Sequence, residues 1–267
     1  MPRPPRQPRL ELKQMNDTDE SYPGGYGACP EALRQYFDDG TIDGYERVLS
    51  EGKEAVVHVV SKSSDGGKLY YAAKVYKKRE ERGFKNRADY FVTQGLIKRR
   101  TLLAIRKKSG FGRRVEEAVW QHRETAYLEA LAAAGADVPA LVKAGPDSFI
   151  MEYLGDGAER ALKLVEAKNE ITDPRGVFER VMRNVELFLH CNIVHGDLSP
   201  YNVLYHRGRV VVIDFPQASD PRLNPNAQAL LLRDIRNVCV FFAKWSVPAD
   251  PEALFGEMWN KYQLSEI

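Results

Sequence analysis

The sequence predicts an α+β protein of two lobes, because strand-like segments dominate its first part and helical segments its later part. Three short segments between residues 45 and 76 are rich in β-branched and aromatic side chains and are separated by glycine-containing turns. From about residue 115 onward, three longer segments carry apolar residues at helical spacing. With 267 residues, the chain can bury a sizeable core as one domain or as two closely packed lobes.

The composition divides the chain into three parts. Residues 1–28 hold clustered prolines and a polar middle, and are expected to form a disordered basic tail. Residues 29–247 are expected to form the folded domain, with an N-terminal lobe over about 45–152 and a C-terminal lobe over about 156–247. Residues 248–267 are expected to be a C-terminal extension with a short amphipathic segment.

The N-terminal lobe is predicted to combine strands with one long helix. YERVLSEG from Tyr45, EAVVHVVS from Glu54 and LYYAAKVY from Leu69 have the composition of strands and are separated by turns. A strong helical pattern then covers about residues 115–134. ALVKAG and SFIMEYL, which follow it, predict two further strands.

The C-terminal lobe is predicted to contain two helices with a hairpin between them. Asp173 supplies an N-cap and Pro174 a first-turn proline for a helix that carries apolar residues at helical spacing. The apolar segments VLY and RVVVI are joined by a turn at Arg207 and Gly208. A last apolar helix is predicted over about residues 227–245.

Charge and cysteine content exclude several classes of protein. Lys and Arg total 39 and Asp and Glu total 37, so the net charge of +2 predicts no strong overall attraction to nucleic acids or membranes. Cys29, Cys191 and Cys239 form no C-x-x-C pair, which argues against a disulfide framework and a zinc site. No segment approaches the ~20 apolar residues of a membrane span, and the N-terminus lacks the apolar core of a secretory signal. We therefore expect a cytoplasmic protein without disulfides.

The hairpin around Gly208 predicts a metal site. Asn202 lies six residues before Gly208 and Asp214 six residues after it, so a hairpin centred on Gly208 would place these two residues opposite each other. Opposed side chains on one face of an antiparallel pair lie ~5 Å apart. An amide oxygen and a carboxylate so placed suit Mg²⁺, which takes few protein ligands and several phosphate or water oxygens.

A second carboxylate precedes this pair. Asp197 lies five residues before Asn202, where it can orient a hydroxyl group or water and accept its proton. An Asp, an Asn and a second Asp in this order are the layout of phosphoryl transfer in kinases. Two turn-forming acids beside an ordinary hairpin are the alternative interpretation.

Two charged residues stand in apolar surroundings further upstream. Lys74 lies inside the apolar strand YYAAKVY, where an unpaired charge would be costly. Glu124 shares a helical face with Trp120, Leu128 and Leu131. We therefore predict that Lys74 pairs with Glu124 and reaches the phosphates of ATP; two separately exposed side chains are the alternative.

Two further segments would complete a nucleotide site. Residues 50–58, with the single glycine Gly52, would form a strand–turn–strand cover over the phosphates, although an ordinary hairpin fits the segment equally well. Residues 149–155 would join the lobes and hold adenine through their backbone.

Several motifs together resemble the RIO family of atypical protein kinases. The resemblance covers about residues 45–247 and implies a two-lobed protein-kinase-like fold that lacks the activation segment and the peptide-binding helices. The motifs are GKEA at 52–55, AAKVYK at 72–77, FKNRADY at 84–90, WQHRETAYL at 120–128, MEYLG at 151–155, HGDLSPYNVLY at 195–205, IDFPQA at 213–218 and LLRDIRNVCVFFAKW at 231–245.

The resemblance implies a serine/threonine kinase that uses ATP with Mg²⁺ or Mn²⁺. Asp197, Asp214 and Lys74 are then the catalytic residues, and Asn202 and Asp214 are the metal ligands. For this family, Asp214 is also the residue implied to receive phosphate as an acyl-phosphate. The implied nucleotide-binding residues are Lys53, Glu54, Ala55, Val56, Lys74, Glu124, Met151, Glu152 and Leu154.

Two other functions stay open. The core motifs around Asp197 and Asp214 also occur in small-molecule phosphotransferases of the aminoglycoside and choline kinase type. GKEA, FKNR and DFPQ favour the RIO family, and only 53 residues follow Asp214, which is little for a dedicated substrate lobe. An assembly factor whose ATP hydrolysis switches its affinity for a ribonucleoprotein is the other alternative.

The stretch 77–114 is locally basic. It contains 14 Lys and Arg residues but only three acids, with aromatic residues between them. Such a segment can neutralise phosphates and stack on bases. The resemblance to the RIO family, whose members are similar to ribosome-maturation factors, implies RNA or a ribosomal particle as one candidate partner. A solvated loop, or one that binds an acidic protein, is the alternative interpretation.

The segment after Asp214 is short. IDFPQASDPRLNPN leads almost directly into the last helix and contains no A-P-E motif. The catalytic motif also has Gly196 where an arginine often receives an activation-loop phosphate. We therefore predict activity that needs no activating phosphorylation.

Overall fold

The fold is seen in a computed structural model of the chain, which describes residues 29–77, 110–157 and 159–267. The predicted tail and most of the basic stretch lie outside the described residues. The elements are η1 Glu31–Leu33, α1 Arg34–Asp38, β1 Gly44–Glu51, β2 Ala55–Ser64, β3 Gly67–Tyr76, α3 Gly110–Ala133, β4 Leu141–Ala144, β5 Ser148–Glu152, β6 Gly155–Asp156, β7 Glu159–Arg160, β8 Leu162–Lys163, η4 Ala167–Asn169, α4 Pro174–His190, β9 Val203–His206, β10 Arg209–Val212, α5 Ala227–Phe242, η5 Ala243–Trp245 and α6 Pro251–Gln263.

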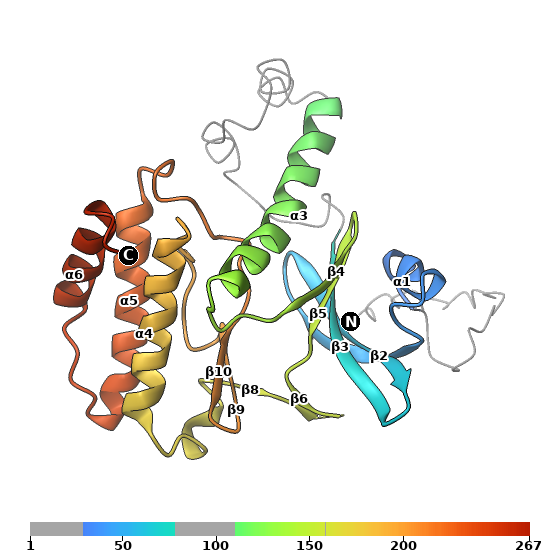
Figure 1. Ribbon diagram of the computed structural model, residues 1–267, viewed down its shortest axis with the longest axis horizontal. Helices are drawn as coiled ribbons and strands as arrows, with labels where there is room; N and C mark the ends of the chain where they lie inside the picture. Colours follow the sequence, from blue (N-terminus) through green and yellow to red (C-terminus); the bar gives the residue numbers. More distant parts are fainter. Residues whose placement is uncertain (1–28, 78–109, 158) are drawn as a thin grey trace, which may run out of the picture.

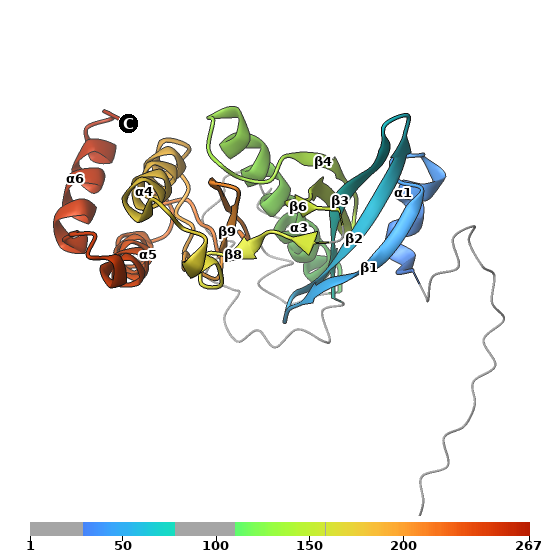
Figure 2. The same ribbon diagram turned by 90° about the horizontal axis from the view of Figure 1, so that it is seen from below.

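The N-terminal lobe is an antiparallel sheet with strand order β1-β2-β3-β5-β4. All five strands were predicted, and the α+β class is confirmed. α1 covers the outer face of this sheet, and α3 lies on the opposite side, toward the helices of the C-terminal lobe (Figures 1 and 2). Because side chains alternate along a strand, one sheet can serve two cores. Val60, Ala73 and Ile150 pack toward α1, whereas Phe149 and Tyr76 belong to the main core.

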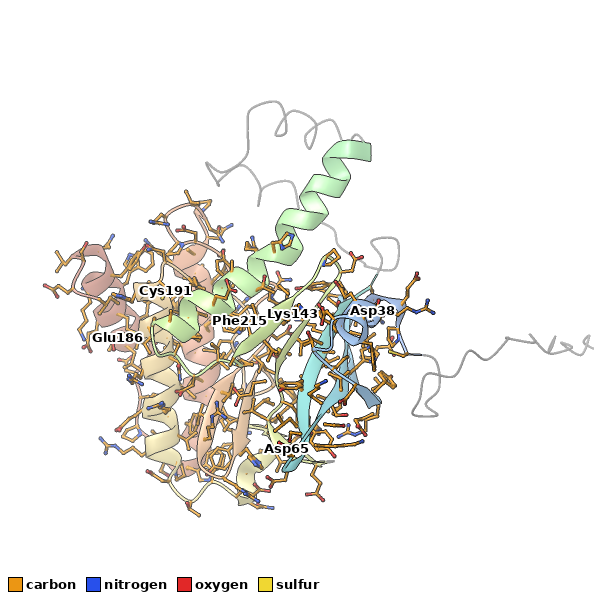
Figure 3. All side chains as sticks on the ribbon, turned by 45° about the vertical axis from the view of Figure 1, so that its right-hand side comes forward. Asp38, Asp65, Lys143, Glu186, Cys191 and Phe215 are labelled. Atoms are coloured by element: carbon orange, nitrogen blue, oxygen red, sulfur yellow. The ribbon has the colours of Figure 1, made fainter. Side chains whose placement is uncertain are left out.

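The helix α1 was not predicted. Tyr36 is fully buried and its hydroxyl donates to the carbonyl oxygen of Ser148 at 2.8 Å. Lys143 of β4 forms an ion pair with Asp39 at 2.6 Å, next to Asp38 at the end of the helix (Figure 3). These contacts attach the segment before β1 to the far edge of the sheet.

The helix α3 begins five residues before the predicted start. Glu124, Leu128 and Leu131 are all buried, as expected for one face of the helix. The side chain of Trp120, predicted to share this face, lies outside the described part of α3. The carboxylate of Glu124 is thus placed on the buried side of the helix.

The C-terminal lobe is built from α4, α5 and α6, which lie side by side (Figure 1). α4 begins as predicted, because Asp173 accepts a hydrogen bond from the backbone of Gly176 at 2.9 Å and Pro174 occupies the first turn. Asp250 caps α6 in the same way. In the described residues, no helix is long and apolar enough to cross a membrane, and Cys29, Cys191 and Cys239 are free thiols.

The predicted register of the β9–β10 hairpin is wrong by one residue. Arg207 and Gly208 form a two-residue turn, with φ of 49° and 81°, so that Arg209 pairs with His206. Both positive φ values are typical of the tight turns that match strand twist. The pairing axis therefore lies between residues 207 and 208, and Asn202 faces Ile213 rather than Asp214, with the Ile213 N–H donating to the Asn202 carbonyl oxygen at 2.9 Å.

Candidate active site

A cavity of about 510 Å³ lies between the N-terminal sheet and the C-terminal lobe. Its lining combines apolar side chains with a smaller set of charged and amide groups, as is usual for ligand sites. The apolar residues include Leu49, Ala55, Val57, Ala72, Met151, Leu154, Leu204 and Ile213, and the polar ones include Lys74, Glu124, Lys163, Asp197, Asn202 and Asp214.

Lys74 is at the centre of the charged part of the cavity. Its Nζ lies 2.6 Å from Oε1 of Glu124, which confirms the predicted pair, and also 2.9 Å from Oδ1 of Asp214. Only 6 % of Lys74 and 4 % of Glu124 is exposed, so both charges depend on this pairing. Burial opposes the lysine charge, but the Asp214 and Glu124 carboxylates outweigh it and raise the pKa of Lys74.

Glu124 also fixes the segment that follows Asp214. Its Oε2 accepts from the Tyr76 hydroxyl at 2.8 Å, and its Oε1 from the backbone N–H of Phe215 at 3.3 Å. Phe215 is 1 % exposed and lies in the interior between α3 and the C-terminal lobe (Figure 3). α3 thereby links β3 to the backbone of the Asp214–Phe215 segment.

Asp214 adopts a left-handed backbone conformation with φ of 71°, just after β10. The chain turns here, and 45 % of the Asp214 side chain remains exposed in the cavity. The charge of Lys74 holds the pKa of Asp214 below its usual range against the opposing effect of burial, with a smaller contribution from Lys163. Asp214 is therefore a carboxylate that can accept a further cation.

The loop after α4 presents Asp197 and Asn202 to the same cavity. The side-chain amide of Asn202 donates to the carbonyl oxygen of Asp197 at 2.9 Å and to its Oδ2 at 3.4 Å. Because the amide nitrogen is engaged within the loop, Oδ1 of Asn202 is the atom left to bind a metal. Among the described residues, no group of three or more His, Cys, Asp or Glu could hold a metal, so a metal here would depend on few protein oxygens.

Buried His195 supports this loop from inside. Its Nδ1 accepts from the backbone N–H of Asp197 at 3.2 Å, and its Nε2 lies 3.1 Å from the carbonyl oxygen of Ile213. Burial lowers the pKa of His195 and so favours the neutral ring, and the two contacts assign its proton to Nε2. The His195 ring thus connects the Asp197 loop to Ile213, which lies between the end of β10 and Asp214.

Asp234 of α5, which was not predicted, holds the Asp197 loop from the other side. It is 1 % exposed and accepts from the backbone N–H groups of Gly196 at 2.7 Å and Leu198 at 3.0 Å. Asn237 adds a bond to the Leu198 carbonyl oxygen at 3.0 Å. Burial raises the pKa of Asp234 to about 7, although both backbone donors and Arg233 favour its charged form.

Gly196 is required by both conformation and space. Its φ is 76°, and a Cβ at this position would lie 2.8 Å from the carbonyl oxygen of Gln217. The close approach brings the Asp214–Gln217 segment against the Asp197 loop. The glycine in the H-G-D motif is thus explained by packing.

We expect Gly196→Ala to destabilise the protein more than Gly208→Ala and to reduce its activity. Gly208 has a similar φ of 81° but nothing within 4 Å of its added Cβ, so alanine there costs only the conformational penalty of about 1–2 kcal/mol. Urea unfolding of the two variants compares these costs. Equal losses of stability in the two variants would show that the Gln217 carbonyl oxygen can move away from the added Cβ without an energetic cost.

Most of the predicted nucleotide-binding residues line the cavity, and one does not. Lys53, Glu54 and Ala55 lie along it, as do Met151, Glu152 and Leu154. Val56 is absent from the lining and Val57 takes its place, because successive side chains of β2 point to opposite faces.

Arg160, Lys163 and Glu166 also line the cavity but were not predicted. They lie on or beside β7 and β8, which are each two residues long and leave no periodic signal in the sequence. The sequence therefore gave no reason to place them at the site.

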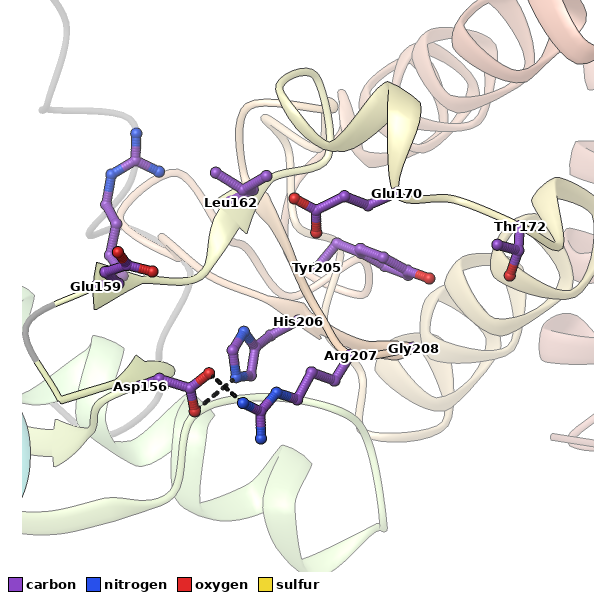
Figure 4. A pocket seen from close by; sticks show the side chains of 10 residues that line it. Asp156, Glu159, Leu162, Glu170, Thr172, Tyr205, His206, Arg207 and Gly208 are labelled. Carbon is purple, nitrogen blue, oxygen red and sulfur yellow. Dashed lines mark ion pairs between the residues drawn. The ribbon is translucent and has the colours of Figure 1, made fainter.

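A second cavity, of about 590 Å³, lies on the other side of β8 and β9 (Figure 4). Tyr205 points into it, and Asp156 pairs at its edge with Arg207 at 2.7 Å and His206 at 3.4 Å. None of the predicted catalytic, metal or nucleotide residues lines this cavity.

Comparison with known proteins places the chain in a family. The RIO domain matches residues 55–254. The RIO-type serine/threonine-protein kinase Rio1 of Haloferax volcanii is 31% identical over 224 residues, which are 84% of this chain and 72% of that protein. Rio1 of Schizosaccharomyces pombe and RIO3 of Bos taurus are both 30% identical, over 79% of this chain. The chain spans only 41% and 40% of their lengths.

The fold agrees with this assignment. The Rio2 kinase–ADP/Mg²⁺–phosphoaspartate complex from Chaetomium thermophilum superposes with a TM-score of 0.59 at 18% identity, covering 85% of this chain and 64% of that one. The protein-kinase-like fold predicted from the sequence is thus confirmed. With the RIO domain covering most of its described residues, the chain belongs to the RIO family of atypical serine/threonine kinases.

Proposed function

We propose that the chain uses ATP with Mg²⁺ to transfer the γ-phosphoryl group to a serine or threonine of a protein, itself included, or to water. The observation that carries this proposal is the contact of Lys74 with both Glu124 and Asp214 in a cavity that also contains Asp197 and Asn202. Phosphoryl transfer depends mainly on positioning and charge stabilisation, and these residues can supply both.

The apolar side chains of the cavity suit an adenine ring. Ala72 of β3, Leu154 after β5 and Leu204 of β9 come from both lobes, so that a planar ring could lie between them. β5 leads from one lobe to the other and offers backbone groups for hydrogen bonds. Lys74 would then face the phosphates, held in place by Glu124.

Asn202 and Asp214 would hold the magnesium ion. The free amide oxygen of Asn202 and the exposed carboxylate of Asp214 form a hard-oxygen donor set, which fits Mg²⁺ or Mn²⁺. When bound, the ion neutralises negative charge on the phosphate oxygens. The structure of the relative Rio2 is described as containing ADP and Mg²⁺, which supports Mg²⁺ together with a nucleotide as the ligands of this cavity.

Asp197 would orient the acceptor and take its proton. The Rio2 complex is also described as containing phosphoaspartate, so in this chain Asp214 itself is a second proposed acceptor. Its carboxylate oxygen would bond to the γ-phosphorus as the bond to ADP breaks, and water would later release phosphate. An acyl-phosphate is cleaved by hydroxylamine, whereas a phosphoserine is not, so this treatment separates the two acceptors.

We expect Mg-ATP to raise the melting temperature of the wild-type protein, since a ligand of the folded state stabilises it by mass action. Asp214→Ala should lose the magnesium-dependent part of the shift. Asp156→Ala is the matched control, because Asp156 lies at the other cavity and pairs with Arg207. An equal magnesium-dependent shift in Asp214→Ala and wild type would refute the metal assignment.

A further inference from the structure

Lys163 is a cationic side chain that lines the cavity between the lobes, and its position there was not predicted from the sequence. It lies on β8, where Leu162 pairs with Tyr205 and Lys163 pairs with Leu204 of β9. Leu162 and Tyr205 both point into the second cavity (Figure 4). Since side chains alternate along strands, Lys163 and Leu204 face the opposite side, and both line the cavity between the two lobes.

The backbone of Lys163 is fixed relative to the Asp197 loop. The backbone N–H of Leu164 donates to the Val203 carbonyl oxygen at 2.7 Å, and that of Val165 to the Pro200 carbonyl oxygen at 3.2 Å. Lys163 therefore approaches the cavity from the C-terminal lobe, whereas Lys74 approaches it from the N-terminal sheet.

Of the other cations of the cavity, Lys53 is exposed at the edge of the N-terminal lobe, and the remaining two are already engaged. Lys74 contacts two carboxylates, and Arg160 binds both oxygens of Glu166 at 2.7 and 2.9 Å. Glu166 also accepts from Lys163 at 2.9 Å, but the donor is the backbone N–H of the lysine and not its side chain. Among the described side chains, the ammonium group of half-buried Lys163 makes no hydrogen bond or ion pair.

The catalytic loop itself offers no positive charge to a phosphate. From Asp197 to Asn202 it reads DLSPYN, without lysine or arginine. A triphosphate in the cavity would lie between this loop and Lys74. Its negative charge then has to be neutralised by cationic groups from both lobes. Of the described side chains, Lys163 is the half-buried cation of the C-terminal lobe that is not already paired there.

We propose that Lys163 is a second phosphate-binding cation, which contacts the nucleotide polyphosphate from the C-terminal lobe. This inference rests on the proposed ATP-dependent function. It predicts that Lys163 contributes to affinity for the phosphates and nothing to affinity for the nucleoside.

The test compares binding of adenosine, ADP and ATP, each with Mg²⁺, to purified wild type and three variants by calorimetry. Lys163→Met keeps the length of the side chain but removes its charge, and should weaken ATP binding about tenfold, as expected for a lost charge-assisted hydrogen bond. Adenosine binding should be unchanged. Lys163→Arg should recover most of the affinity for ATP.

Lys168→Met is the control for net charge. Lys168 is exposed on η4, five residues away, and does not line the cavity. This variant should bind all three ligands as wild type does, and the melting temperature without ligand checks that each variant is folded.

The outcomes separate this inference from the function on which it rests. Wild type that binds ATP more tightly than adenosine, together with a Lys163→Met variant of unchanged ATP affinity, overturns the role of Lys163 alone. An equal loss for adenosine and ATP assigns Lys163 to the shape of the pocket and also overturns it. Wild type that binds no ATP overturns the proposed function itself.

Discussion

Replacing Lys74 by alanine is expected to lower the free energy of unfolding by about 3–5 kcal/mol, because it breaks a buried ion pair and leaves one charge behind. Glu124 is 4 % exposed and would lose its contact at 2.6 Å. Its remaining donors, the Tyr76 hydroxyl and the Phe215 N–H, are neutral and cannot replace the ammonium. Turnover should fall strongly as well, since Lys74 is the proposed contact to the phosphates.

The matched control is Lys62→Ala in the neighbouring strand. Lys62 lies 3.5 Å from Asp43, but the two side chains are 38% and 37% exposed, and such surface pairs contribute about 0–1 kcal/mol. Urea unfolding of both variants gives the comparison. Adding Glu124→Gln to Lys74→Met should recover part of the stability that Lys74→Met loses, because no unpaired charge then stays buried. Compared with the two single variants, the double variant measures the coupling energy between Lys74 and Glu124. A Lys74→Ala variant as stable as Lys62→Ala would show that the pair contributes little.

The central ion pair was predictable because its residues conflict with their surroundings. A lysine within an apolar strand and a glutamate on an apolar helical face each need a partner, and the structure brings Lys74 and Glu124 together. The same reasoning applies to Asp234, which lies on the buried face of α5 beside Leu231 and Val238. Its partners are backbone N–H groups, however, and these carry no sequence signal.

The features that were predicted wrongly or missed have local physical causes. The register of the hairpin depends on whether the turn centres on Gly208 or between Arg207 and Gly208, and only the backbone angles decide this. α1 is too short to show a helical period, although it buries Tyr36 completely. β8 is two residues long and is ordered by its pairing with β9, so the position of Lys163 follows from the tertiary fold alone.

Replacing Asp197 by asparagine is expected to produce the largest loss of turnover, about 10²–10⁴-fold, the usual contribution of a positioned general base. The backbone of the loop should stay in place, because it is held by His195 and Asp234 through groups that the substitution leaves unchanged. Asparagine has the same size as aspartate but cannot accept a proton at neutral pH. Binding of Mg-ATP, which depends on Lys74 and the metal ligands, should therefore be nearly unchanged.

The short segment after Asp214 and the glycine of the H-G-D motif predict activity that needs no prior phosphorylation. The segment from Asp214 to Asn226 leads directly into α5 at Ala227, and its start is held between Glu124 and Gly196. With glycine at position 196, the H-G-D motif has no arginine to bind a phosphate on this segment. Phosphatase treatment of the wild type should therefore leave ATP turnover unchanged, and phosphorylation of generic peptides should be poor.

Both expectations can be measured with ATP labelled at the γ-phosphate, following ADP release and label on the protein before and after phosphatase treatment. Asp220→Asn is the control, because Asp220 lies on the same connecting segment but pairs locally with Arg222 at 2.6 Å. It should keep wild-type turnover, while Asp197→Asn loses both hydrolysis and the hydroxylamine-resistant autophosphorylation of serine or threonine. Asp197→Asn with more than a tenth of wild-type turnover would contradict its role as the base, since proton transfer would then proceed without it. Loss of wild-type activity after dephosphorylation would instead mean that the short segment carries a regulatory phosphate, held by a group other than residue 196.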